Sequence, residues 1–161
     1  MISHQLLQHY PFFGSLNDAQ LRAIASVAEE LLLESGQTLF FEGQPADALY
    51  ILVDGCVELY YGANESDSLD FNGFLVGGIS PGEAIAISSL IEPHILTSTA
   101  RASKPSRVIK INTRALLDLF KTDRRLAYVL THKTAKIAIE RLLTTRIQLA
   151  ALWSKEINQI A

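Results

Sequence analysis

The middle of the chain, from Leu31 to Ile111, constrains the fold most, because short β-prone runs alternate there with turn-forming residues. Asp54-Gly55 is the sharpest turn signal, and the polar stretch Ala63–Asp70 is typical of a hairpin loop. Many short strands at such spacing predict a compact antiparallel barrel or roll. The expected strands are Thr38–Phe41, Ala48–Val53, Val57–Tyr61, Gly73–Ile79, Ile95–Ala102 and Arg107–Ile111.

Helices are expected on both sides of this β-rich region. Asn17 and Gln20 form a capping-box pattern at the start of a helix from about Asp18 to Ala28. After the last strand the sequence favours helix, with a short segment from Arg114 to Phe120 and a long one from about Arg124. The sequence therefore predicts an α+β fold with an antiparallel double-stranded, jelly-roll-like β-roll, an N-terminal helix and a long C-terminal helix. The expected ranges are 1–161 for a single domain, about 31–111 for the roll and about 113–158 for the C-terminal helices.

The long helix carries an apolar seam with alternating spacings of four and three residues, which is typical of paired helices. A helix of roughly 30 residues would extend about 45 Å, further than the roll it leaves, so its far end needs a partner. A second copy of the chain is the favoured partner, and the alternative is a helix folded back on its own domain. The expected dimer positions are Ile139, Leu143, Arg146, Ala150, Trp153, Ile157 and Ile160.

Composition and charge exclude several classes of protein. The formal net charge of -3 gives no reason to approach nucleic acid, and the single cysteine, Cys56, excludes an internal disulfide or a cysteine-based metal site. The N-terminus lacks a signal-peptide pattern, and no apolar run reaches the length of a membrane span. The four histidines are scattered, and neither a nucleophile elbow nor a P-loop is present. We therefore expect a cytoplasmic, non-enzymatic protein without a metal centre that binds neither nucleic acid nor membrane.

Two segments at the entrance of the roll carry a recognisable pattern. Residues 36–59 read GQTLFFEGQPADALYILVDGCVEL, and residues 11–21 before them read PFFGSLNDAQL. Together with Gly82-Glu83, they resemble the cyclic nucleotide-binding domain family, in particular the catabolite-activator-like sensor domains, over roughly residues 11–145. The resemblance implies a free-standing sensor domain, because the chain stops at Ala161 without the helix-turn-helix domain that a complete regulator of this type carries.

Gly82-Glu83 is the most informative pair of residues in this pattern. A carboxylate that opens a short helix beside free backbone N–H groups can hold a ribose hydroxyl while the amides face a phosphate. In the family this glutamate holds the ribose 2′-hydroxyl, which implies the same role for Glu83. The alternative is that Glu83 is a solvated residue at a helix start, as most lone glutamates are.

The segment after Gly82-Glu83 departs from the family, which usually carries there an arginine that pairs with the cyclic phosphate. Counting back from Arg101 places Leu96 at the arginine's position, whereas counting from Pro93 places His94 there. A phosphate is costly to bury without a counter-charge, so firm binding of cyclic AMP or cyclic GMP is not expected, although a protonated His94 could supply part of the charge. The candidate ligand residues are Gly82, Glu83, Ala84, Ser88, Ser89, His94, Leu96, Thr97 and Ser98.

The sequence leaves two non-enzymatic functions open. The first is a regulatory sensor, dimeric through its C-terminal helix, whose roll takes a small ligand, and the resemblance implies cyclic AMP or cyclic GMP. The second is a degenerate domain that serves as a protein–protein interaction module without nucleotide binding, its pocket filled by side chains such as Leu96 or Ile85. The missing arginine is the argument for the second function. The residues identify neither a certain cofactor nor a protein partner.

Overall fold

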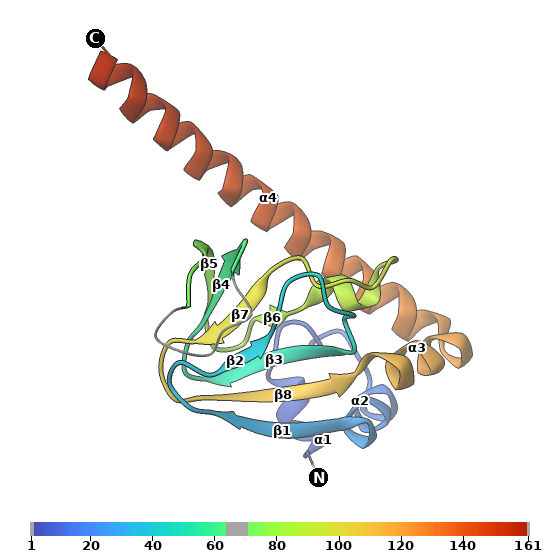
Figure 1. Ribbon diagram of the computed structural model, residues 1–161. Helices are drawn as coiled ribbons and strands as arrows, with labels where there is room; N and C mark the ends of the chain where they lie inside the picture. Colours follow the sequence, from blue (N-terminus) through green and yellow to red (C-terminus); the bar gives the residue numbers. More distant parts are fainter. Residues whose placement is uncertain (1, 64–70, 161) are drawn as a thin grey trace.

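The computed structural model describes residues 2–63 and 71–160, which form two four-stranded antiparallel sheets flanked by helices (Figure 1). The sheets have the strand orders β1-β8-β3-β6 and β2-β7-β4-β5, and they make the predicted α+β roll. The strands are β1 (Ala28–Leu33), β2 (Thr38–Phe40), β3 (Ala48–Asp54), β4 (Val57–Tyr61), β5 (Phe74–Ile79), β6 (Ala84–Ile85), β7 (Thr99–Ala102) and β8 (Ser106–Asn112). The helices are α1 (His4–Gln8), α2 (Asp18–Ser26), the 3₁₀-helix η1 (Ile87–Leu90), α3 (Thr113–Thr122) and α4 (Arg124–Ile160). The predicted loop Ala63–Asp70 lies outside the described residues except for Ala63.

The sheet that contains β3 and β8 lies between two hydrophobic cores, because successive side chains of a strand point to opposite faces. Leu49 and Ile51 of β3 pack with the helices, whereas Leu52 packs into the interior of the roll. Val57 from β4 and Ala100 from β7 reach the same interior from the second sheet. The roll therefore has a core of its own, and the helices cover the outer face of the first sheet.

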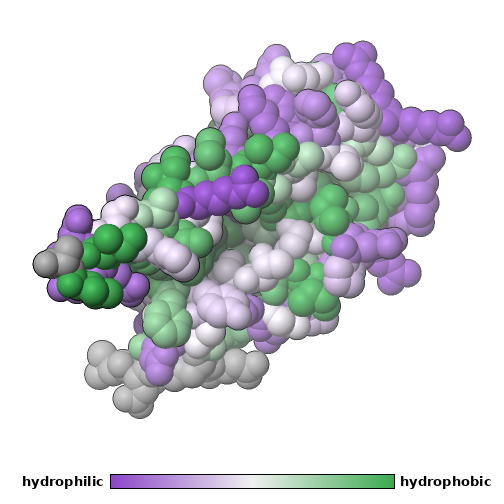
Figure 2. Space-filling view, turned by 90° about the horizontal axis from the view of Figure 1, so that it is seen from above, coloured by the Kyte–Doolittle hydropathy of each residue, from purple (hydrophilic) through white to green (hydrophobic). Residues whose placement is uncertain are grey.

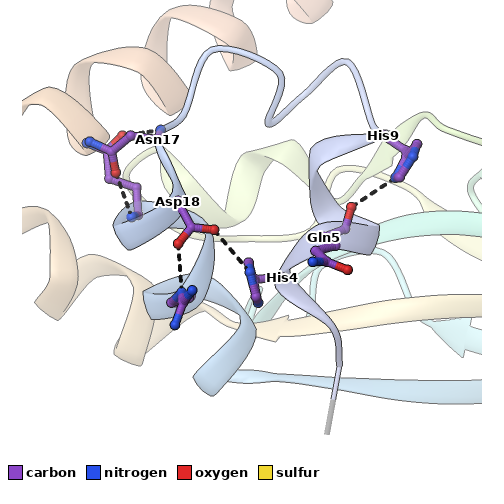
Figure 3. A network of polar contacts seen from close by, with 7 residues as sticks. His4, Gln5, His9, Asn17 and Asp18 are labelled. Atoms are coloured by element: carbon purple, nitrogen blue, oxygen red, sulfur yellow. Dashed lines mark hydrogen bonds and ion pairs between the residues drawn. The ribbon is translucent and has the colours of Figure 1, made fainter.

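Helices α1 and α2 are joined by a network of polar contacts near the N-terminus (Figure 3). The Asn17 side chain accepts a hydrogen bond from the Gln20 N–H at 2.9 Å, and Gln20 Oε1 accepts one from the Asn17 N–H at 3.1 Å. This confirms the predicted capping box. Asp18 Oδ1 lies 3.0 Å from His4 Nε2, and Asp18 Oδ2 lies 2.8 Å from Arg22 Nε, so Asp18 links the two helices.

The structure corrects the predicted end of the first long helix and the predicted start of the strand before Ala102. Helix α2 ends at Ser26, and Ala28 instead begins β1, which lies at the edge of the sheet beside β8. The prediction of helix to Ala28 is wrong because the Ala-Glu-Glu-Leu run has good helix formers, whose weak preference is overridden by pairing with β8. The predicted strand Ile95–Ala102 is also too long, since β7 begins at Thr99 and Ile95 contributes an isolated bridge to Pro45.

Helix α4 leaves the roll partway along its length (Figure 1). Leu126, Leu130 and Thr134 in its first half are buried, whereas every residue from 142 to 160 is exposed. The alternative in which the far end folds back on its own domain is therefore wrong. None of the helices in the described part of the chain combines the length and apolar character that a membrane span needs.

Candidate functional site

A hollow of about 1060 Å³ lies between the roll and helix α4. Figure 2, which views the molecule from above Figure 1, shows a recess beside the projecting helix and hydrophobic side chains along the helix itself. The lining combines residues 9–12, several residues of the roll and one face of α4. The α4 residues in the lining are Ile137, Glu140, Arg141, Thr144, Thr145 and Gln148.

Gly82, Glu83 and Ala84 form the turn on the roll side of the hollow. Gly82 has a φ of 92°, a left-handed conformation that glycine adopts without strain, and its N–H donates to the Leu52 carbonyl at 2.7 Å. The Leu52 N–H donates in return to the Glu83 carbonyl at 3.0 Å. The Glu83 side chain accepts a hydrogen bond at Oε2 from the Ser80 N–H at 2.6 Å. These bonds fix the turn against β3 and place the Glu83 carboxylate in the lining of the hollow.

Glu83 does not open a helix, so that part of the sequence prediction is wrong. The chain after Glu83 forms β6, which pairs with β3, and η1 begins only at Ile87. The pairing of Ile85 with Tyr50 buries Ile85 in the roll and keeps this segment extended. The η1 residues are not in the lining of the hollow. The N-terminus of η1 therefore supplies no positive end to the lining beside Glu83.

The predicted ligand residues separate into two groups. Gly82, Glu83, Ala84, Thr97 and Ser98 all line the hollow, so the structure brings the turn and the segment before β7 together. The remaining four do not line it; they are Ser88, Ser89, His94 and Leu96.

Neither position considered for the family's arginine reaches the hollow. Leu96 is 5% exposed, packs in the interior of the roll, and donates its N–H to the Gln44 carbonyl at 2.9 Å. His94 Nδ1 lies 2.7 Å from the Ser89 carbonyl oxygen, and His94 lines a separate hollow beside α3. Leu96 and Ile85, which the sequence suggests as pocket-filling side chains, are both in the interior of the roll and leave the hollow open.

The sequence analysis missed Arg141, which reaches the hollow from α4. Its Nη2 donates a hydrogen bond to the Ala84 carbonyl oxygen at 2.5 Å. Burial lowers the pKa of Arg141, and the charge of Glu83 acts in the opposite direction. Arg141 thus brings to the hollow a counter-charge that the sequence analysis did not find, and it comes from a distant helix and not from the segment after Gly82-Glu83.

The spacing of residues on α4 contains a signal for this contact. Leu130 and Thr134 are buried, and the same helical face continues through Ile137, Arg141 and Thr145 at steps of three and four residues. A face that begins apolar and continues with arginine and threonine predicts a helix that leaves a core and then borders a polar site. The sequence of α4 alone could have indicated that Arg141 lies on this face. It could not have indicated that the face contacts the Gly82–Ala84 turn.

The positions of the predicted dimer seam lie on another face of α4. Ile139, Leu143, Trp153 and Ile157 are 67%, 58%, 64% and 64% exposed, and Arg146 and Ala150 between them are exposed as well. Ile139 and Leu143 are each two residues from Arg141, so they point away from the hollow. Whether a second chain covers this seam stays a prediction.

An antiparallel roll that borders a hollow together with a C-terminal helix defines a class of small β-roll domains with a site for a ligand between the two. The sequence model of the cyclic nucleotide-binding domain matches residues 30–123, more than half of the chain. The chain belongs to the cyclic nucleotide-binding domain family, as the resemblance in its sequence implies.

Solved structures support the same assignment. A protein from Geobacter metallireducens GS-15, provisionally named a cyclic nucleotide-binding protein, is 37% identical with a TM-score of 0.76, and the match covers 88% of this chain and 99% of that one. The N-terminal domain of a transcriptional regulator from Streptomyces coelicolor A3(2) is 27% identical with a TM-score of 0.64, covering 89% and 94%. The sensor domain of the transcriptional regulator DNR from Pseudomonas aeruginosa is 25% identical with a TM-score of 0.65, covering 83% and 91%. No curated protein sequence matches the chain. This chain is therefore similar to domains that belong to transcriptional regulators, including one described as a sensor domain.

Proposed function

We propose that this domain is a regulatory sensor that takes a small ligand between the roll and α4, with cyclic AMP and cyclic GMP as the first candidates. The observation that carries the proposal is the composition of the hollow, whose lining comes from both the Gly82–Ala84 turn and α4. A ligand that contacts both would stabilise the observed position of α4 relative to other positions of the helix. Such a shift between positions is what transmission of a signal requires. The domain does this without catalysis.

The size and chemistry of the lining support a ligand of nucleotide size. The volume of about 1060 Å³ is slightly above the range of about 300 to 1,000 Å³ for small-ligand sites, so the hollow has room for a ligand of this size. Leu59 and Ile137 offer apolar surface to a base, and the Glu83 carboxylate can accept hydrogen bonds from sugar hydroxyls. Thr97 and Ser98 add hydroxyl groups on the roll side.

We further propose that the sensor is a homodimer through α4. A row of large apolar side chains that stays exposed on a single chain is typical of an interaction surface, and the spacing of Ile139, Leu143 and Trp153 fits a helix pair. The ligand would then act on one face of α4 while the second copy packs on the other.

Isothermal titration calorimetry of the purified chain with cyclic AMP and cyclic GMP tests the ligand site. We expect binding that becomes about tenfold weaker or more in Glu83→Gln, because a hydrogen bond to a charged group contributes about 1.5 to 3 kcal/mol. Glu92→Gln alters an exposed glutamate outside the hollow and should leave binding unchanged. No heat with either nucleotide at millimolar concentration would remove the sensor proposal.

A second candidate is an interaction module without nucleotide binding, which the exposed apolar row on α4 favours. Such a module would act with its hollow empty, since Leu96 and Ile85 do not fill it. A dimeric chain that gives no heat with either cyclic nucleotide would support this candidate over the sensor.

A further inference from the structure

Arg141 is a half-buried cation in the hollow whose observed hydrogen-bond partner is a backbone carbonyl. None of the ion pairs formed among residues 2–63 and 71–160 involves it. The Ala84 carbonyl accepts one of its five N–H donors but does not neutralise the charge. A charge held away from water is costly unless an opposite charge compensates it. The site thus holds a cation that an anionic group would stabilise.

Glu83 lies close enough to Arg141 to influence its pKa, yet the two side chains make different bonds. Glu83 Oε2 accepts from the Ser80 N–H at 2.6 Å, while Arg141 donates to the next residue's carbonyl. The hollow therefore offers an acceptor for hydroxyl groups and a donor for anionic oxygens side by side. Glu140, the other acid in the lining, is exposed, so water and salt screen its charge. A ligand with both hydroxyl groups and a phosphate matches this pair.

Building on the proposed function, we infer that Arg141 binds the anionic group of the ligand through N–H donors that the Ala84 carbonyl does not occupy. The planar guanidinium can contact two phosphate oxygens at once, which makes it well suited to this role. Because Arg141 belongs to α4 and Glu83 to the roll, a hydroxylated anion such as a cyclic nucleoside monophosphate would tie the helix to the roll. An uncharged nucleoside would contact the roll without this tie.

Calorimetry with cyclic AMP and with adenosine, which lacks the phosphate, tests the role of Arg141. In Arg141→Gln we expect cyclic AMP to bind about tenfold more weakly or worse, while adenosine binds within about twofold of the unaltered chain. Arg141→Lys keeps the positive charge but cannot make a bidentate contact to the phosphate. It should therefore lower the affinity for cyclic AMP less than Arg141→Gln does. Lys136→Gln, an exposed change on the same helix outside the hollow, is the matched control.

The possible failures are distinguishable. Equal affinity for cyclic AMP in the unaltered chain and in Arg141→Gln would overturn the role of Arg141. It would not contradict the proposal that the domain is a sensor. No binding of either compound by the unaltered chain would overturn both. A second measurement needs no variant: raising the ionic strength should weaken cyclic AMP relative to adenosine, and an unchanged ratio would contradict the inference.

Discussion

Asp123 joins α3 to α4 and ties both helices to α2. Its Oδ1 accepts a hydrogen bond from the Leu126 N–H at 2.9 Å, and its Oδ2 accepts one from Gln20 Nε2 at 2.9 Å. These bonds, the one from Leu126 first, lower the pKa of Asp123 because they favour the ionised carboxylate. The stability that the ionised form contributes is present above the ordinary pKa of 3.8 and is lost as the pH falls through the lower folded value.

We expect Asp123→Asn to lower the melting temperature at neutral pH, because the amide has a single accepting oxygen where the carboxylate has two, and it lacks the charge that strengthens these bonds. The difference from the unaltered chain should shrink on acidification and vanish below the folded pKa of Asp123. Thermal melts followed by circular dichroism between neutral and strongly acidic pH measure this difference. Asp47→Asn, at an exposed aspartate before β3, is the control. A difference between Asp123→Asn and the unaltered chain that stays constant over the whole pH range would contradict the account.

At the scale of residues, the sequence could predict the part of the site that neighbouring residues build. Gly82 and Glu83 are adjacent, and the turn signal at Gly82 places them together without knowledge of the rest of the fold. Arg141 could not be assigned this way, because 57 residues separate it from the Ala84 carbonyl that it contacts. Leu96 and His94 are candidates for the arginine's position only because of their distance along the sequence from Arg101 and Pro93. Sequence distance does not show that Leu96 packs in the interior of the roll or that His94 bonds to the Ser89 carbonyl of η1.

Helix α4 presents two faces that the proposals use differently. Arg141 and Thr145 border the hollow, whereas Ile139 and Leu143 lie about 200° around the helix from Arg141, at about 100° per residue. One face is thus available to a ligand and the other to a second chain. The same rigid element would transmit occupancy of the hollow to the dimer.

The proposed dimer is tested by Leu143→Glu, which would place a charge in the apolar seam. We expect the dimer to dissociate about tenfold more readily or worse, since burying an unpaired charge is costly. Leu32→Glu alters a leucine on β1 that is even more exposed than Leu143, and it should leave association unchanged. Sedimentation equilibrium over a range of concentrations measures both. The account fails if the unaltered chain is monomeric throughout, or if Leu143→Glu associates as tightly as Leu32→Glu.

At the scale of elements, strands with strong local signals could be predicted and strands that depend on partners could not. The range of β4 matches the prediction because aromatic and β-branched residues follow a sharp Asp-Gly turn. By contrast, β1 consists largely of Ala, Glu and Leu and is extended because it pairs with β8 over its full length. The two-residue strand β6 exists only through its pairing with β3.

At the scale of the whole molecule, the roll and the first half of α4 form one packed unit, and the second half of α4 extends from it (Figure 1). The sequence predicts both parts, from the spacing of turns and from the length of the last helix. It could not predict the angle at which α4 leaves, because that angle follows from the packing of Leu126 and Leu130 into the core that the helices share with the first sheet. That angle is what brings Arg141 over the Gly82–Ala84 turn.

Hydrogen exchange with and without cyclic AMP tests most directly whether one ligand is held by the roll and by α4 together. We expect slower exchange in two segments far apart in the sequence, residues 82–85 and 140–148, and no change around the separate hollow at His94. Slower exchange in the roll with α4 unchanged, or a response centred on His94, would contradict the account.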